Sequence, residues 1–484
     1  MGFLDGSVVN IAIPPIQNSL HANISDIQWI VNSYLLMLST LILISGSLGD
    51  KFGVKRIFTL GIIVFTTSSF LCGLSSGITQ LIIFRALQGI GAAMMVPGSL
   101  SIIITSFDPK EHGKAIGLWS GISGGIAALG PLLGGYLVQF FGWPSIFLIN
   151  VPIGILALII TFKYIPFTKF NDSFKIDFAG TILVFLSFLG IAYGLIEQPV
   201  NGWDMRVLAS ILIGFILFII FIFWERRVKN PLIPLEIFKN PLVVGANIAT
   251  LFLYGALSAV LFFMVLNLEQ IQHLSPFWAG AGLLPTILII TFLSGPAGSL
   301  ADRIGPRTPM ILGPATVGVG MASFALFGRN ANYFIAFLPG LVLFGLGMAL
   351  VIAPLTKSAL SVEHKYSGSA SGVNNAVARV AGLLTVALLG AIVVTVFSAK
   401  LSKSISQTDL STTQKQQIMV QKSDLGGITM PEKFTTDLKV EAQIAIEDSF
   451  IYGFRIAMTI CAFLAFLAAG VSFLTIKNPK ISPK

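Results

Sequence analysis

The stretch Gly46-Ser47-Leu48-Gly49-Asp50-Lys51-Phe52-Gly53-Val54-Lys55-Arg56 lies between two long apolar runs. It is short, charged and rich in glycine, as a turn at a membrane surface would be. The chain repeats the pattern later as Gly298-Ser299-Leu300-Ala301-Asp302-Arg303-Ile304-Gly305-Pro306-Arg307, again between two apolar runs. A charged turn that recurs at matching places indicates an internally duplicated membrane protein.

The composition supports a membrane protein. Of 484 residues, 55% are hydrophobic and only 11% are charged, against about 25% charged in a typical soluble domain. Most apolar runs are long enough to cross the roughly 30 Å of hydrocarbon as a helix. We count fourteen runs: 1–20, 27–48, 57–75, 78–105, 113–140, 144–165, 176–196, 205–224, 242–268, 276–300, 308–327, 333–354, 369–397 and 450–476. We therefore predict an all-α integral membrane protein with fourteen transmembrane helices.

The positive charges predict the orientation in the membrane. Loops on one side of the predicted spans carry nineteen Lys and Arg residues, and the short loops on the other side carry two, Arg206 and Arg329. Cytoplasmic loops carry the excess of Lys and Arg, so we expect a multi-pass protein of the inner or plasma membrane with both termini in the cytoplasm. The net charge of +9 is then a topology signal, and we do not expect a nucleic-acid partner.

Two parts of the chain depart from this regular pattern. The linker 398–449 is long, polar and placed on the outer side; we expect it to be partly helical near 433–447 and otherwise mobile. A tolerated insertion and a binding surface for an outer adaptor protein both stay open for it. At the start, Asp5 precedes Ile16, the expected outer end of span 1, by eleven residues, about 17 Å along a helix. This depth predicts that the natural start lies upstream or that the chain is truncated.

Asp5 and Arg85 are the charged residues that this pattern makes conspicuous. Charges near the membrane centre are costly and tend to mark function, and Asp5 is the only acidic residue deep inside a predicted span. Arg85 enters span 4 about 10 Å from its outer end, where a long side chain could reach Asp5. Gln88 shares its helix face. We predict proton coupling through Asp5 and Arg85; a fixed structural ion pair is the alternative.

Five motifs together resemble a known family. Gly46–Arg56 matches the loop 2–3 signature of the major facilitator superfamily, and the segments LIIFRALQGIGAA (81–93) and GIAALGPLLGG (125–135) resemble its span 4 motif and its span 5 antiporter motif. LDGSVVNIAIP (4–14) looks like the span 1 motif of its fourteen-helix drug:proton antiporter family, the EmrB/QacA kind, and SGSASGVNN (367–375) followed by Arg379 is similar to span 13. Pro144-Ser145 and Pro306 depart from the family pattern.

The resemblance implies an architecture and a cycle. We expect an N-terminal six-helix bundle in 1–166, two linker transmembrane helices in 167–240, and a C-terminal six-helix bundle in 241–484 that contains the outer loop 398–449. Substrate would bind near the midplane between the bundles, with alternating access by rocking.

The resemblance also implies roles for particular residues. A conformational latch between the bundles would use Gly46, Asp50, Gly53, Lys55 and Arg56, and in the second copy Asp302 and Arg303. A positive-inside turn with a capping Asp is the alternative. The antiporter motif would supply a tight helix seam through Gly125, Gly130, Pro131, Gly134 and Gly135, or only ordinary small-residue packing. We take Gln88, Asn374, Asn375 and Arg379 as substrate-cavity candidates.

No other chemistry stands out in the sequence. It contains no P-loop and no nucleophile elbow, and its four histidines lie in or beside loops without metal-ligand spacing. Cys72 and Cys461 each lie inside an apolar run and are interpreted as small buried hydrophobes. We therefore expect no enzyme activity, no cofactor and no metal.

The resulting hypothesis is a secondary active transporter that exports drugs or other amphipathic small molecules by proton antiport. Its partners would be the amphipathic substrate, protons and the lipid bilayer. An exporter of an endogenous metabolite or lipid on the same fold, and a non-transporting membrane receptor or scaffold, are the alternatives.

Overall fold

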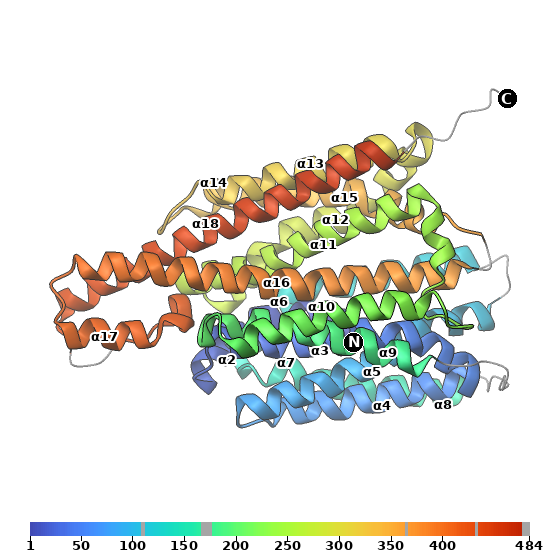
Figure 1. Cartoon of the computed structure of the whole chain (residues 1–484), viewed down its shortest axis with the longest axis horizontal. Coiled ribbons are helices and arrows are strands. Elements are labelled where there is room, and N and C mark those ends of the chain that lie inside the picture. The colour runs from blue at the N-terminus through green and yellow to red at the C-terminus, as the bar shows by residue number, and fades with distance from the viewer. Residues whose placement is uncertain (108–111, 166–176, 364–365, 431–433, 477–484) are drawn as a thin grey trace.

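The computed structural model describes residues 1–107, 112–165, 177–363, 366–430 and 434–476. The regular elements in these ranges are all helices (Figure 1). The first ten α-helices are α1 (Gly2–Ile11), α2 (Ile13–Leu20), α3 (Ile24–Phe52), α4 (Val54–Gly73), α5 (Ile78–Ser106), α6 (His112–Phe141), α7 (Ser145–Leu148), α8 (Asn150–Tyr164), α9 (Phe178–Asn201) and α10 (Met205–Glu225). The remaining helices are η1 (Leu235–Lys239), α11 (Pro241–Leu266), η2 (Asn267–Ile271), α12 (Pro276–Ile304), α13 (Arg307–Phe324), α14 (Tyr333–Ala336), α15 (Leu338–Ala359), α16 (Ser367–Ser406), α17 (Thr412–Val420), η4 (Lys422–Gly427) and α18 (Thr436–Thr475).

Many of these helices have membrane length. Within the described ranges, eleven helices are long and apolar enough to cross a membrane, so the all-helical membrane class holds while the number fourteen stays a prediction. The expected spans 1–20, 113–140 and 308–327 are outside those eleven.

The first of these spans is divided in two. Pro14 and Pro15 open α2, and because proline has no N–H, the carbonyls of Asn10 and Ile11 lose their usual helical partners. The chain therefore ends α1 at Ile11 and restarts with α2, and neither piece alone could cross a bilayer.

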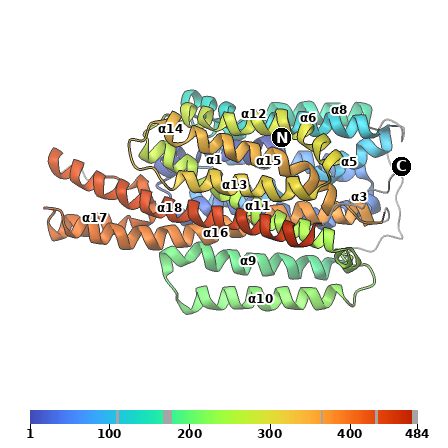
Figure 2. The ribbon, with the colours of Figure 1, turned by 90° about the horizontal axis from the view of Figure 1, so that it is seen from above.

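The helices associate as two halves with a pair beside them. In the first half α5 packs on α3 and α4, α8 packs on α4, and α6 packs on α1; in the second, α11 packs on α16 and α18, and α15 packs on α12 and α13. Helices α9 and α10 pack on each other along one flank (bottom in Figure 2), and α9 also contacts α3 and α16. The two halves meet chiefly through α3 on α16 and α6 on α12.

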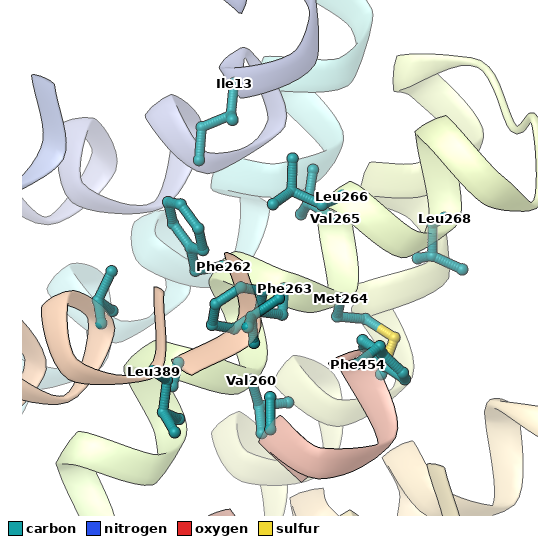
Figure 3. Close-up of a cluster of buried hydrophobic side chains, with 14 of the residues drawn as sticks. Ile13, Val260, Phe262, Phe263, Met264, Val265, Leu266, Leu268, Leu389 and Phe454 are labelled. Atoms are coloured by element: carbon teal, nitrogen blue, oxygen red, sulfur yellow. The ribbon is translucent and has the colours of Figure 1, made fainter. Parts of the chain in front are cut away.

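The apolar core is densest around α11. Phe262 and Phe263 are almost fully buried, and their rings meet edge to face with centroids 5.1 Å apart. Met264 continues this buried run toward Phe454 of α18, and Ile13 of the first half lies close by (Figure 3). Contacts from both halves thus cover the C-terminal part of this helix, which explains why residues 259–266 are apolar on every side.

The linker 398–449 differs from the expectation. Helices α16 and α18 each run for 40 residues and continue beyond the other helices, where α17 joins them (left in Figure 1). We call residues 398–449 the extension. The Ser411 side chain forms a capping box with Gln414 at the start of α17, and Ile418 and Leu425 are buried. The prediction of a mostly mobile linker is therefore wrong for the described residues, because these apolar side chains give the polar segment a core of its own.

Candidate functional site

Asp5 of α1 and Arg85 of α5 form a buried ion pair. Arg85 Nη1 lies 2.6 Å from Asp5 Oδ2, and the two side chains are 2% and 0% exposed. The sequence-based expectation that Arg85 could reach Asp5 is thus met geometrically. Burying two charges costs free energy unless their remaining polar atoms are also satisfied, so the neighbours of the pair decide what it can do.

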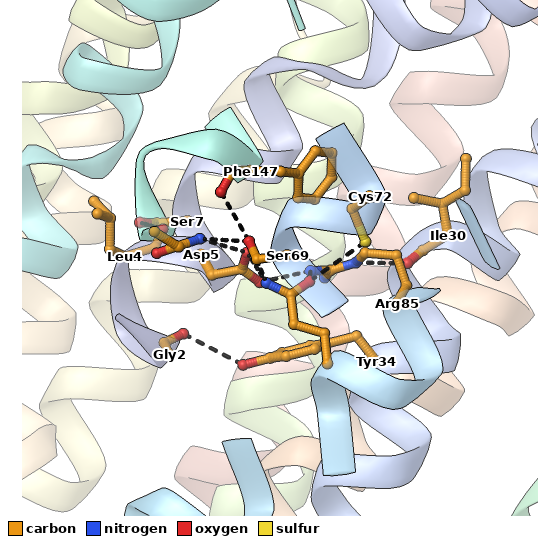
Figure 4. A network of polar contacts seen from close by, with 12 residues as sticks. Gly2, Leu4, Asp5, Ser7, Ile30, Tyr34, Ser69, Cys72, Arg85 and Phe147 are labelled. Carbon is orange, nitrogen blue, oxygen red and sulfur yellow. Dashed lines mark hydrogen bonds and ion pairs between the residues drawn. The ribbon is translucent and has the colours of Figure 1, made fainter. Parts of the chain in front are cut away.

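Gln88 binds both members of the pair. It lies one turn after Arg85 on α5, accepts a hydrogen bond from Arg85 Nη1 at 2.7 Å, and donates from Nε2 to Asp5 Oδ1 at 2.8 Å. Figure 4 shows Asp5 and Arg85 facing each other at the centre of this network. Its Nε2 also lies 3.1 Å from Ser69 Oγ of α4. Gln88 is completely buried, so among the described residues it belongs to this network and does not line an open cavity.

Two residues that sequence reasoning missed complete the carboxylate's surroundings. Asn150, the first residue of α8, places Nδ2 at 3.4 Å from Asp5 Oδ1 and at 3.1 Å from Ser69 Oγ. The Ser69 hydroxyl in turn donates to the Phe147 carbonyl at 2.9 Å. Single Asn and Ser residues inside apolar runs are common, and only their convergence from α4 and α8 identifies them.

The guanidinium of Arg85 is held from three directions. Its Nε donates to the Ile30 carbonyl at 3.2 Å, its carbon lies 4.3 Å from the centre of the Tyr34 ring, and the Phe147 ring is on another side at 5.7 Å. Cation–π contact is strongest where water is excluded. These three contacts hold the Arg85 side chain in place in addition to its ion pair with Asp5.

The two asparagine candidates on α16 make their hydrogen bonds within the second half. Asn374 Nδ2 is 2.9 Å from Thr250 Oγ1 and 3.3 Å from Asn247 Oδ1, both on α11. Asn375 is exposed, and its Nδ2 donates to the Ser371 carbonyl of its own helix at 3.0 Å.

Arg379 of α16 lies near one tyrosine of each half. It interacts electrostatically with Tyr34 of α3 and with Tyr254 of α11. Because Tyr34 also stacks on Arg85, Arg379 and the ion pair share one neighbour across the boundary between the halves.

The first signature turn is held inside its own half. Gly53 adopts φ = 93° between α3 and α4, a conformation that favours glycine, whereas Gly46 lies in α3 with open space around it. Lys55 is buried, and its Nζ donates to the carbonyls of Phe162 and Ile165 at the end of α8.

Arg56 and Asp50 are the remaining residues of the predicted latch in the first turn. Arg56 is exposed. The Asp50 side chain, on which the latch hypothesis depends most, lies outside the described residues.

The second signature turn pairs within the other half. Asp302 Oδ1 lies 2.6 Å from Lys357 Nζ of α15, and both side chains are well exposed, as is Arg303. An exposed pair of this kind contributes about 0–1 kcal/mol. The pair borders a pocket of about 480 Å³ that Gly298, Ala301 and Pro354 also line.

The antiporter motif brings two backbones together across the halves. A Cβ on Gly135 of α6 would collide with the Pro276 carbonyl oxygen and lie 2.8 Å from Phe277 Cα of α12. A Cβ on Gly280 of α12 would in the same way collide with the Pro131 carbonyl oxygen of α6. These glycines permit the close approach.

The remaining glycines of the motif face the first half or are not fully described. Gly130 and Gly134 pack against Ser7 and Val8 of α1. Nothing is described of what surrounds Gly125.

The described residues hold no group of three or more His, Cys, Asp and Glu side chains that could bind a metal ion. Cys72 and Cys461 are free and buried, as expected of small apolar side chains.

These observations and one comparison place the protein. A chain with this many membrane-length helices is a multi-pass membrane protein. Residues 1–386 match the family model for the Major Facilitator Superfamily. The chain therefore belongs to the Major Facilitator Superfamily and is a transporter, not an enzyme.

Relatives and a solved structure agree with this placement. The chain is 31% identical over 484 residues to the tetracenomycin C resistance and export protein of Streptomyces glaucescens, covering 98% of this chain and 89% of that protein. It is 34% identical over 374 residues to the riboflavin transporter RibZ of Clostridioides difficile, covering 76% and 81%. The crystal structure of a bacterial homolog to the human lysosomal transporter Spinster, in an inward-facing and occupied conformation, aligns with a TM-score of 0.64 at 17% identity, covering 98% and 93%.

Proposed function

We propose that this protein exports drugs or other amphipathic small molecules in exchange for protons, by alternating access between two six-helix bundles. The observation that carries the proposal is the Asp5–Arg85 pair, a titratable carboxyl bound to a fixed cation at 2.6 Å and closed off from solvent. The resistance and export function printed for the Streptomyces glaucescens relative supports the direction and the class of cargo.

The proposed coupling step is a competition at Asp5. While Asp5 is ionised, Arg85 and Gln88 hold it. A proton on Asp5 removes its charge and with it most of the attraction to Arg85, so the contact between α1 and α5 weakens. Arg85 then carries an uncompensated buried charge, which is costly and favours a conformation that admits an anion, a polar substrate group or water. Proton and substrate would thus alternate.

We propose that the halves rock about the helix pairs that join them. We place the bundles in 1–166 and 241–484, with the linker helices in 167–240. Both termini would lie in the cytoplasm and the extension on the outer side of the membrane. The close crossing of α6 on α12 lies at the end of the bundle that carries the extension, so this conformation would be closed toward the outside. The turns at Asp50 and Asp302 would stabilise the opposite state from the cytoplasmic end, and Asn374, Asn375 and Arg379 would face the substrate.

Drug-dependent proton movement tests the proposal. Inverted membrane vesicles that contain the protein are energised with a pH gradient, and a quenched dye reports that gradient while cationic, neutral and anionic amphiphiles are added in turn. We expect particular compounds to collapse the gradient in the wild type but not in Asp5→Asn. Collapse that survives in Asp5→Asn would remove Asp5 from the coupling step. Absence of collapse with every compound, in folded protein, would favour an endogenous substrate outside the panel, another coupling ion, or a non-transporting receptor or scaffold.

A second candidate cargo is an endogenous metabolite. The 34% identity to a riboflavin transporter favours it, because that relative is named for a vitamin and not for a drug. Adding flavins to the same vesicles separates the two candidates: collapse by a flavin and by none of the amphiphiles would replace the drug proposal with metabolite transport.

A further inference from the structure

One atom in the Asp5 network has no evident use. Asn150 is completely buried, and its Nδ2 lies near both Asp5 Oδ1 and Ser69 Oγ, but its Oδ1 has no hydrogen-bond partner among the described residues. A buried acceptor without a partner costs free energy, and such atoms in native proteins call for an explanation. One explanation is that Oδ1 accepts a hydrogen bond only when Asp5 is protonated and has no partner when Asp5 is ionised.

The chemistry of Asp5 supplies the second state. An ionised carboxylate only accepts hydrogen bonds, so Asn150 turns its NH₂ group toward it. A protonated carboxyl must also donate, and the other side-chain groups that face Asp5, from Arg85 and Gln88, are donors. Turning the Asn150 amide over by about 180° would bring Oδ1 to the place where Nδ2 now lies. From there it can accept the new O–H.

Gln88 and Ser69 cannot accept a hydrogen bond from protonated Asp5 in the same way. The Gln88 amide already uses its oxygen for Arg85 and its nitrogen for Asp5 and Ser69, so reversing it would place two donors against each other. The Ser69 hydroxyl donates to the Phe147 carbonyl. Reversing Asn150 gives up the hydrogen bond from its Nδ2 to Ser69 and moves that Nδ2 to the place where Oδ1 now has no partner among the described residues. It places no donor against Arg85 or Gln88. We infer that Asn150 is the hydrogen-bond acceptor for protonated Asp5, a positioning residue whose amide turns over with each protonation.

This role rests on the proposed proton exchange, in which Asp5 is the carrier. Ionisable groups that interact electrostatically with Asp5 include Arg85 of α5, Tyr34 of α3, Cys72 of α4 and the amino group of Met1. A variant at Asn150 leaves all of these in place. Any change in the pH dependence of Asp5 in that variant is therefore attributable to the amide.

Infrared titration of the purified protein without substrate tests the inference directly. The C=O band of protonated Asp5 is identified by its loss in Asp5→Asn, and its intensity is followed against pH. In Asn150→Ala we expect the midpoint to fall by about one pH unit, because a hydrogen bond to the protonated form is lost while Arg85 and Gln88 still hold the ionised form. Asn150→Ser keeps a hydroxyl acceptor and disturbs packing less, so its midpoint should fall by a smaller amount.

Asn32→Ala is the matched control, since Asn32 is another completely buried amide without a hydrogen-bond partner among the described residues, and it should leave the midpoint unchanged. A midpoint that stays constant in both Asn150 variants would overturn the inference. A midpoint that rises would overturn it as well, because Asn150 would then act only as a donor to ionised Asp5. The vesicle assay separates this failure from failure of the proposed function. Suppose that the wild type shows no proton exchange in vesicles while the infrared midpoint still falls in Asn150→Ala. The proposed proton exchange would then be overturned, and the assignment of Asn150 as the hydrogen-bond acceptor would stand.

Discussion

The close crossing of α6 on α12 makes a quantitative prediction about the conformational equilibrium. A methyl group at Gly135 would meet the backbone at Pro276, and one at Gly280 would meet the backbone at Pro131. Backbone atoms cannot turn aside as a flexible side chain can, so the two helices must separate. Overpacking of this kind costs about 1–3 kcal/mol, which is a shift of about 5- to 150-fold in a two-state equilibrium. Gly295→Ala on α12 is the control, because nothing lies within 4 Å of the added methyl group.

Spin labels can read this equilibrium. Phe141 at the end of α6 and Trp278 near the start of α12 are both well exposed, at 67% and 62%, and accept labels on introduced cysteines while the native buried cysteines stay unlabelled. We expect Gly135→Ala and Gly280→Ala each to move the distance distribution toward longer separations and Gly295→Ala to leave it unchanged. If the two seam variants match the control, the glycines are ordinary packing positions and the reasoning from close backbone approach is refuted.

Three further outcomes follow from the geometry. Burial, aided by the charge of Asp26, raises the pKa of the Asp424 carboxyl from its ordinary 3.8 to about 6. The folded state thus holds this proton more tightly, and the stabilisation present at low pH is lost as pH rises through about 6. The opening free energy of η4, measured by amide exchange corrected for the intrinsic exchange rate, should fall over that range and become pH-independent in Asp424→Asn. Arg85→Met leaves Asp5 buried and unpaired, which costs about 3–5 kcal/mol; adding Asp5→Asn should restore most of the lost melting temperature in detergent, and no recovery would contradict the pairing. A maleimide should label neither native cysteine until the protein is unfolded, and rapid labelling would show that their helices open.

The buried ion pair was predictable because charges inside apolar runs are rare. Asp5 and Arg85 each interrupt such a run, and that signal needs no knowledge of the fold. Asn150 and Ser69 carry no comparable signal, since neutral polar side chains occur throughout membrane helices, and their role arises only where α4 and α8 converge on α1. Which residues share a site is a matter of helix packing that periodicity alone does not determine.

The extension was misjudged for a different reason. Its Ser, Thr, Gln and charged residues are typical of a solvated linker, and a few well-spaced apolar residues such as Ile418 and Leu425 outweigh them by packing against the ends of α16 and α18. The break in the first predicted span is also invisible to its average composition, because the paired prolines at Pro14 and Pro15 alone divide it into two helices. In both places a small number of side chains decides the local structure against the average composition.

The unbroken length of α16 and α18 has a mechanical consequence. Each has 40 residues and measures about 60 Å, roughly twice the hydrocarbon thickness of a bilayer. Both helices are packed into the second half, and their far ends lie well beyond it (Figure 1). A small tilt between the halves would therefore displace α17 by more than it displaces the residues at the boundary between the halves. The hydrogen bond from Gln17 Nε2 to the Asp424 carbonyl at 3.0 Å joins the extension to α2 of the first half. If the halves rock as proposed, a probe on α17 would report that motion at a distance from the Asp5–Arg85 site.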